Sequence, residues 1–134
     1  MILIVDTTVW IDFFAGRTEP HTSALESFIK RRYDICICGI ILMEVLQGIR
    51  KEKDYKKVKG LFDKLIFLPM EYSSFIKAAE IYRSLRRRGI TIRKSLDCLI
   101  ASVAIEYDIP LLHNDRDFNL IEKHCGLKSI KLGE

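Results

Sequence analysis

The chain has 134 residues, of which 49% are hydrophobic, and 22 Lys and Arg outnumber 18 Asp and Glu to give a net charge of +4. This length and balance predict one globular domain over residues 1–134 with an ordinary hydrophobic core, and they exclude a disordered chain. No apolar run reaches the ~20 residues of a membrane-spanning helix and the start lacks a signal-peptide pattern, so we expect a soluble cytoplasmic protein without membrane contact.

Short aliphatic runs predict the strands of a sheet. The five runs lie at residues 2–5, 34–38, 65–69, 110–113 and 128–132. They are too apolar to leave one face in water, which is typical of parallel strands covered by helices on both faces. Because helical segments alternate with them, the sequence predicts an α/β protein, a three-layer α/β/α sandwich with a short, mostly parallel central sheet.

Segments with helical periodicity separate these runs. The seven segments span residues 7–14, 23–32, 40–49, 51–65, 74–88, 96–107 and 118–124. The sixth, "LDCLIASVAIEY", is apolar nearly all round, which predicts a helix buried in the middle of the protein. Asp117 directly precedes the last segment, where it is expected to act as helix cap or as a residue of the outer shell of a site.

Four acidic residues lie in positions that are otherwise apolar or at strand ends. Asp6 directly follows the first strand and Asp115 follows the fourth, so both are expected at the rim of the sheet where parallel strands end and ligands bind. Glu44 lies within "IILMEVL" and Asp97 within "SLDCLIA", where apolar side chains would be expected.

Each acid also has a purely structural interpretation. Asp6 would cap a helix, Asp97 would favour the positive end of its own helix, Glu44 would extend from a partly exposed face, and Asp115 would belong to a turn. The alternative is that the four converge. Carboxylates within ~4 Å repel by a few kcal/mol at an effective dielectric constant near 20, so a cluster requires a divalent cation.

Other metal-binding residue types show no ligand spacing. His21, His113 and His124 are scattered along the chain and are expected at the surface or at strand ends. Cys36 and Cys38 lack the spacing of a zinc knuckle, so all four cysteines are expected to be free thiols. Oxygen ligands without histidine or cysteine suit Mg²⁺ or Mn²⁺.

Positive charge is concentrated in the middle of the chain. Residues 51–100 carry 13 Lys and Arg against 6 Asp and Glu, whereas residues 1–50 carry 5 against 6. Within this stretch Arg87, Arg88, Arg93 and Lys94 precede Asp97 and are candidates for binding RNA phosphates, with Arg93 and Lys94 nearest to the acid. Alternatively, these are solvated charges at a helix end, favoured by the helix dipole.

Four segments occur in a family-specific order: "VDTTVWID", "ICGIILMEVLQGI", "RKSLDCLIA" and "LLHNDRDF". With them the chain resembles the PIN-domain ribonucleases, and specifically the VapC-like toxins of prokaryotic toxin–antitoxin pairs, over nearly its whole length. The resemblance implies metal-dependent endonucleolytic cleavage of RNA. It matches Asp6, Glu44, Asp97 and Asp115 to the family's four acidic positions, and Thr8 to its small polar position.

We expect Asp6 and Asp97 to be the main ligands of Mg²⁺ or Mn²⁺, with Asp115 supporting a second or weaker site. Glu44 is expected to be a ligand or to orient water, and Thr8 to donate a hydrogen bond to a carboxylate or water. Mechanisms with one ion and with two ions are both compatible with the sequence.

The resemblance also implies partners, namely a small antitoxin that covers the site and a second copy in a homodimer. A basic or amphipathic inhibitor segment would pair with the acids in place of metal and lay its apolar face on the protein. The candidate contacts for that face are Trp10, Phe13 and Phe14, of which at least one or two are expected to be buried in the core instead.

Two other functions are weighed against this one. A non-catalytic RNA-binding module would tolerate loss of an acid, and none of the four is missing. A phosphoacceptor receiver domain would need an adjacent acidic pair after the first strand, where this chain has "DTT".

Overall fold

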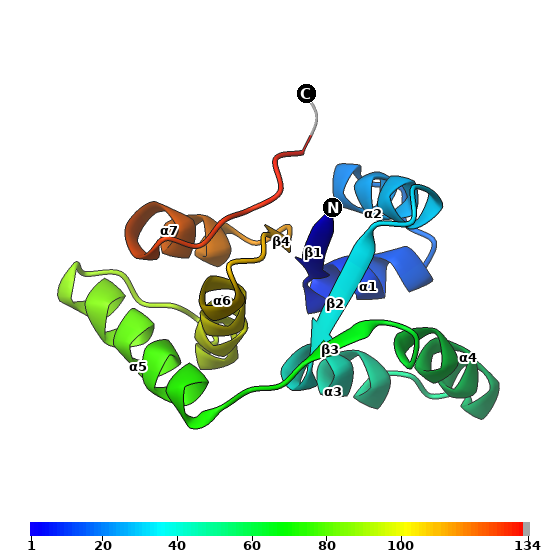
Figure 1. Ribbon diagram of the computed structural model, residues 1–134, viewed down its shortest axis with the longest axis horizontal. Helices are drawn as coiled ribbons and strands as arrows, with labels where there is room; N and C mark the ends of the chain where they lie inside the picture. Colours follow the sequence, from blue (N-terminus) through cyan, green and yellow to red (C-terminus); the bar gives the residue numbers. More distant parts are fainter. Residues whose placement is uncertain (133–134) are drawn as a thin grey trace.

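A parallel sheet forms the centre of the molecule. The computed structural model describes residues 1–132. The strands run in the order β3-β2-β1-β4 and all pairs are parallel (Figure 1). Their bounds are Ile2–Val5 for β1, Asp34–Cys38 for β2, Ile66–Leu68 for β3 and Leu111–Leu112 for β4.

Helices cover both faces of this sheet, with α1 to α4 on one side and α5 to α7 on the other (Figure 1). The helices are α1 (Thr7–Phe14), α2 (Pro20–Lys30), α3 (Gly39–Gln47), α4 (Glu52–Phe62), α5 (Tyr72–Arg87), α6 (Ser95–Tyr107) and α7 (Arg116–Cys125). The predicted three-layer α/β/α sandwich is therefore confirmed. Within residues 1–132, no helix is both long and apolar enough to span a membrane.

The burial pattern explains why these elements form. Every residue of β1 and β2 after the first is buried, as expected for strands with helices on both faces. In α6, residues 97–104 are all buried, which confirms the predicted central helix. All four cysteines are free, as predicted, and three of them lie in the core.

The register of β1 and β4 brings two loops to the same edge. Val5 pairs with Leu112 as the last residue of each strand. Asp6 and His113 therefore leave the sheet side by side, between strands whose connections run in opposite directions. This topological switch point is where open α/β sheets place their ligand sites.

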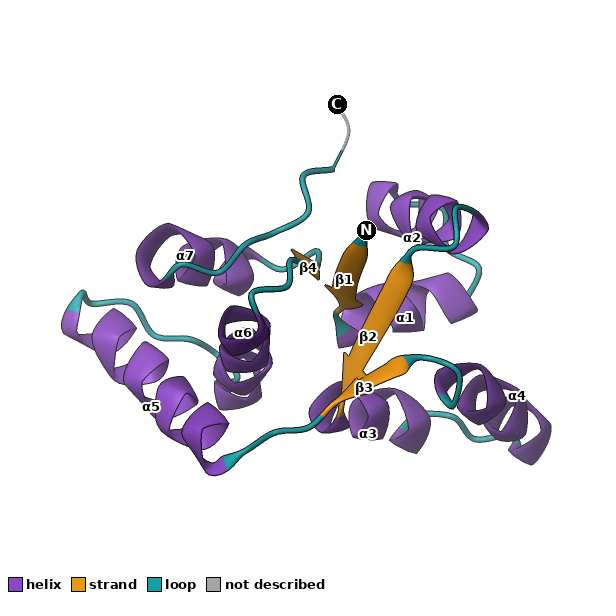
Figure 2. Cartoon of the chain, viewed as in Figure 1, coloured by secondary structure: helices purple, strands orange, loops and turns teal. Residues whose placement is uncertain are grey.

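The predicted fifth strand at residues 128–132 is wrong. Only Ser129 forms an isolated bridge, to Leu111, and the rest of the segment is loop (Figure 2). The reason is the length of β4: with two residues it offers its neighbour a single paired position, closed by bonds from Leu111 N to Lys128 O and from Ile130 N to Leu111 O.

Several helix ends differ from the prediction. At the starts of α2, α5 and α7, capping side chains explain the difference. α2 begins at Pro20, three residues early, because Glu19 and Thr22 form a capping box. α5 begins at Tyr72, where the Glu71 N–H donates to Ser74 Oγ. α4 ends at Phe62 and leaves a turn before β3. The expectation that Asp117 caps α7 is wrong, because Asp115 is the N-cap and accepts from the Asp117 N–H at 2.8 Å.

Two candidates for surface positions, Trp10 and His21, are buried. Burial in the core was expected for at least one or two of the three aromatic residues of the first helix. Trp10 is fully buried and its ring packs against Phe13, Phe14 and Phe62. His21 is 2% exposed rather than at the surface, because its Nε2 pairs with Asp12 Oδ2 at 2.7 Å across the contact between α1 and α2.

Candidate active site

Asp6 is the first residue after β1 and is 3% exposed. It occupies the N-cap position of α1, yet its side chain makes no capping hydrogen bond, so the helix-cap interpretation does not hold. The Thr8 hydroxyl donates to Asp6 Oδ2 at 3.1 Å, as expected of that residue. The carboxylate is thus oriented by a side chain and remains available to a ligand.

Glu44 reaches the same region from the middle of α3. It is half-buried, and its Oε1 accepts a hydrogen bond of 2.8 Å from the Thr7 hydroxyl. Thr7 was not predicted as a residue of the site. Its sequence position predicted only the start of a helix. Its partner lies 37 residues away, and only its position next to Asp6 pointed to a role at the site.

Asp97 comes from the first turn of α6 and is 8% exposed. The residue before α6, Lys94, makes no side-chain cap and is exposed. Asp97 therefore lies at the inner end of a short loop that carries basic residues. The positive charge of Lys94 lowers the pKa of Asp97, and its expected contact with an RNA phosphate stays a prediction.

The electrostatics show that the carboxylates share one environment. The pKa of Asp6 is raised to about 6, chiefly by burial and also by the charges of Glu44 and Asp115, while hydrogen bonds from the Thr7 amide and the Thr8 hydroxyl lower it. Burial also raises the pKa of Asp97 to about 7, reinforced by Asp6, Asp115 and Glu44. The charges of Glu44 and Asp115 therefore reach both Asp6 and Asp97, which places the four acids in one region.

Asp115 lies at the start of α7 and is held by Arg93. Its Oδ1 accepts from Arg93 Nη2 at 3.1 Å, and the Asp117 Oδ2 accepts from Arg93 Nε at 3.3 Å and from the Arg93 backbone N–H at 3.2 Å. Arg93 was expected to contact phosphate, and in the described structure two carboxylates hold it. Arg87 and Arg88, at the end of α5, are exposed.

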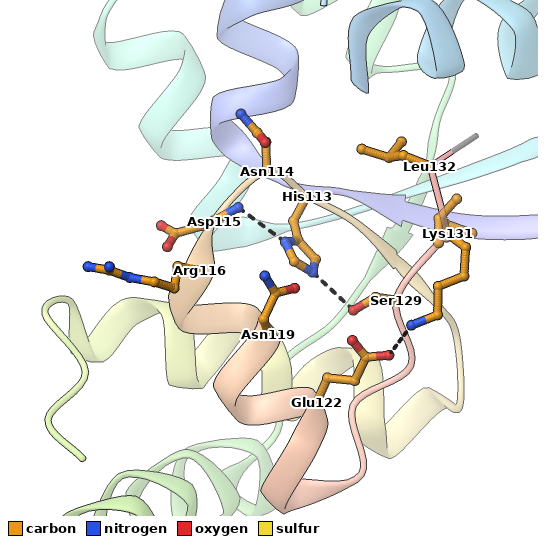
Figure 3. Close-up of a pocket in the computed structure, with 10 residues that line it drawn as sticks. His113, Asn114, Asp115, Arg116, Asn119, Glu122, Ser129, Lys131 and Leu132 are labelled. Carbon is orange, nitrogen blue, oxygen red and sulfur yellow. Dashed lines mark hydrogen bonds and ion pairs between the residues drawn. The ribbon is translucent and has the colours of Figure 1, made fainter. Parts of the chain in front are cut away.

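His113 supports the loop that carries Asp115 (Figure 3). The Asp115 N–H donates to His113 Nδ1 at 3.2 Å, which assigns the ring proton to Nε2, 3.0 Å from Ser129 Oγ. Burial lowers the pKa of His113 and keeps the ring neutral. His113 thus confirms its expected place at a strand end. Beside it lies a cavity of about 300 Å³ that Asp115 and Asn119 also line.

The four carboxylates suit a divalent cation in their chemistry but are not arranged around one. Within residues 1–132, no three carboxylate, histidine or cysteine side chains are already arranged as metal ligands. Glu44 is held by Thr7 and Asp115 by Arg93, so side-chain movement would have to complete a ligand set. In chemistry the residues do fit: the donors are carboxylate oxygens, and their mutual repulsion would be relieved by a hard cation.

The chain is similar to known proteins over nearly its whole length. The sequence profile of the PIN domain matches residues 3–123. The chain is 31% identical to ribonuclease VapC11 of Mycobacterium tuberculosis and to VapC ribonuclease Mb1587 of Mycobacterium bovis, over 96% of this chain and 97% of each relative. A solved structure, VapBC2 from Rickettsia felis bound to a DNA fragment from its promoter, has a TM-score of 0.77 at 22% identity, over 99% of this chain and 100% of that chain.

Proposed function

We propose that this chain, which belongs to the PIN-domain family and is similar over its length to the VapC ribonucleases, is an endoribonuclease toxin of a toxin–antitoxin pair. In this proposal residues 1–134 act as one nuclease domain that hydrolyses RNA with Mg²⁺ or Mn²⁺. One observation supports it most directly: two nearly buried carboxylates, Asp6 and Asp97, have pKa values raised by burial and by the neighbouring acids.

The proposed roles follow from the contacts of each side chain. A bound divalent ion supplies positive charge at the scissile phosphate and activates water for attack. Asp6 and Asp97 would hold that ion, with Thr8 fixing the orientation of Asp6. Glu44, oriented by Thr7, would act as a further ligand or orient water. The exposed Arg87, Arg88 and Lys94 would bind phosphates of the RNA.

We also propose that an antitoxin binds this chain. Its contact surface differs from the one expected from the sequence. Trp10 is excluded by its burial, and Phe13 is half-buried, which leaves Phe14 at 37% exposed. Phe14 lines a hollow of about 490 Å³ between α1 and α4, whose apolar wall comprises Phe14, Ala15, Ile49, Val58 and Leu61. Arg50, Lys51 and Lys57 flank it together with Asp54, so its charged residues are mainly basic. An amphipathic segment with acidic flanks would fit this surface.

A homodimer in the cytoplasm completes the proposal. Its support is indirect and comes from α5, where Tyr72, Phe75 and Ile76 are 82%, 53% and 45% exposed. Apolar side chains gathered on one exposed helix are typical of a protein interface. The rival receiver-domain function has no support here, since Glu44 and Asp97 come from helices α3 and α6 rather than from strand ends.

The decisive experiment is RNA cleavage under metal control. Purified protein should cleave a mixed RNA pool with added Mg²⁺ or Mn²⁺ and should lose this activity in excess EDTA, because the donors are hard carboxylate oxygens. Asp6→Asn serves as the control for contaminating nuclease. Undiminished cleavage by dialysed protein in EDTA would contradict the proposed cofactor, and no cleavage under any condition would favour a non-catalytic RNA-binding module.

A further inference from the structure

Arg93 connects two elements of the candidate site that are remote in sequence. It lies in the loop between α5 and α6, four residues before Asp97. Its side chain binds Asp115 and Asp117 at the start of α7, 22 and 24 residues further along the chain. Arg93 thereby ties the loop that delivers Asp97 to the loop that delivers Asp115.

The contact is anchored from a buried residue. The Asp117 side chain is 6% exposed, and its Oδ2 accepts from both the backbone N–H and Nε of Arg93. This double contact fixes the main chain and the base of the guanidinium, and Nη2 then reaches Asp115. The Arg93 side chain is nevertheless 65% exposed. A guanidinium has five N–H donors, and the two hydrogen bonds from Nε and Nη2 leave others unused.

Asp115 consequently has a positively charged partner, whereas Asp6 and Asp97 have none among the described residues. Its Oδ1 already accepts from the Asp117 N–H at 2.8 Å and from Arg93 Nη2 at 3.1 Å, which uses both lone pairs of that oxygen. A positive charge next to Asp115 also disfavours a divalent cation there. Within the described residues, neither Asp6 nor Asp97 forms an ion pair.

We propose that Arg93 takes the place at Asp115 that a second divalent cation would otherwise occupy. The protein then binds one ion tightly, at Asp6, Asp97 and Glu44, and the exposed Arg93 guanidinium provides the second positive charge and its remaining N–H donors for a phosphate. Asp117 is the positioning residue that keeps Arg93 on Asp115. The inference rests on the proposed function, since it assumes that the acids bind metal.

The test is the number of Mn²⁺ ions bound by the full-length protein without RNA, measured by isothermal titration calorimetry. The wild type should bind one ion tightly. Arg93→Gln should bind a second, with an affinity at Asp115 higher by on the order of tenfold than in the wild type. Asp117→Asn should shift in the same direction, and Arg93→Lys, which keeps the charge, should stay nearer to the wild type.

Two further measurements distinguish a wrong Arg93 inference from a variant that does not fold. RNA binding in EDTA, followed by fluorescence anisotropy, should weaken in Arg93→Gln and recover in Arg93→Lys. Thermal unfolding checks that each variant is folded, and Asp117→Asn provides the second route if Arg93→Gln is not. Two equally tight ions on the wild type, or one ion on both variants, would overturn the Arg93 inference alone. No Mn²⁺ bound to the wild type or to either variant would overturn the proposed metal site together with it.

Discussion

At the residue scale, the candidate site is a place where negative charge is costly. Asp6 and Asp97 are nearly buried, their pKa values are raised to about 6 and about 7, and in both cases burial is the largest cause. A folded structure retains such groups at a cost in stability. The cost is understandable where a bound cation compensates it, and this gives two tests that need no substrate.

The first test is the pH dependence of stability in metal-free buffer. The folded-state pKa of Asp6 lies above its ordinary value of 3.8, so between these pH values the folded protein binds more protons than the unfolded chain. Unfolding temperature in EDTA should therefore be highest near pH 4 and fall as the pH rises from there through 6 to 7. Added Mg²⁺ at pH 7.5 should reverse the fall, and a flat profile would contradict the raised pKa values.

The second test separates function from stability at the same residues. Asp6→Asn or Asp97→Asn should reduce RNA cleavage by more than the roughly 10- to 100-fold typical of losing an outer-shell partner. In EDTA at neutral pH both variants should unfold at the wild-type temperature or above it, because one repelling charge is gone. Lower unfolding temperatures with retained cleavage would favour a purely structural role.

The sequence identified the acids but not what holds them. Asp6, Glu44, Asp97 and Asp115 were recognisable because each interrupts an apolar run or follows a strand. Thr7 bonding Glu44 and Arg93 bonding Asp117 were not predictable, because each pair joins segments 37 and 24 residues apart. Such pairs depend on the packing of α1 on α3 and of the α5–α6 loop on α7, which single-sequence patterns do not encode.

At the element scale, the start of α7 combines a structural and a functional role in one residue. Asp115 caps the helix through the Asp117 N–H and also belongs to the acidic site. The segment "NDRDF" contains two acids, Asp115 and Asp117. The prediction that Asp117 caps α7 was wrong, because Asp115 is the cap. A cap side chain accepts from the N–H two or three residues later, so the second acid was at the wrong distance from the helix start to serve.

Substitutions at Asp115 should separate these two roles. Asp115→Asn keeps an oxygen that accepts from the Asp117 N–H, so its stability should remain close to wild type while RNA cleavage falls. Asp115→Ala should lose both, with a free energy of unfolding lower by about 1 kcal/mol. Urea unfolding of the two variants in EDTA measures the difference. Equal stability of Asn and Ala variants would show that the cap contributes little to α7.

The long periodic elements and all four strands of the sheet were predicted, and the segment at residues 128–132 was wrongly predicted as a fifth strand. α6 and the strands β1 and β2 follow from apolar composition alone, because burial on all sides leaves few alternatives. Residues 128–132 have the same aliphatic character, yet they form one bridge to Leu111. Whether an aliphatic run becomes a strand depends on the length of its neighbour, and β4 has two residues.

At the scale of the whole molecule, the acidic site and a stretch rich in basic residues meet at the loop between α5 and α6, where Arg93 binds Asp115. The acids gather where β1 and β4 end, and the surplus of Lys and Arg lies in residues 51–100, which include α4 and α5. A nuclease of this kind has to be restrained in its own cell. Expression without the neighbouring gene should therefore arrest growth, Asp6→Asn should be tolerated, and the co-expressed pair should purify together without nuclease activity.

Harmless expression of an active enzyme would contradict the toxin assignment and leave the nuclease assignment intact. The control is Asp6→Asn expressed to the same level, which distinguishes toxicity of the reaction from toxicity of the folded protein. Growth arrest by Asp6→Asn as well would indicate that binding of RNA or protein, rather than cleavage, harms the cell.

The hollow beside Phe14 gives the sharpest test of how a partner docks. Phe14→Asp removes an apolar contact from this wall and adds a negative charge that would repel an acidic flanking segment. Phe14 lies at the end of α1 and is 37% exposed, so the variant should fold and keep its metal-dependent nuclease activity. Ile29→Asp on α2, at 38% exposed, is the matched control outside this hollow. In co-purification with the protein encoded beside it, Phe14→Asp should lose its partner and Ile29→Asp should retain it. Retention by both would move the docking surface away from α1 and α4, whereas loss by both would indicate that the charge disturbs the α1–α2 pair as a whole.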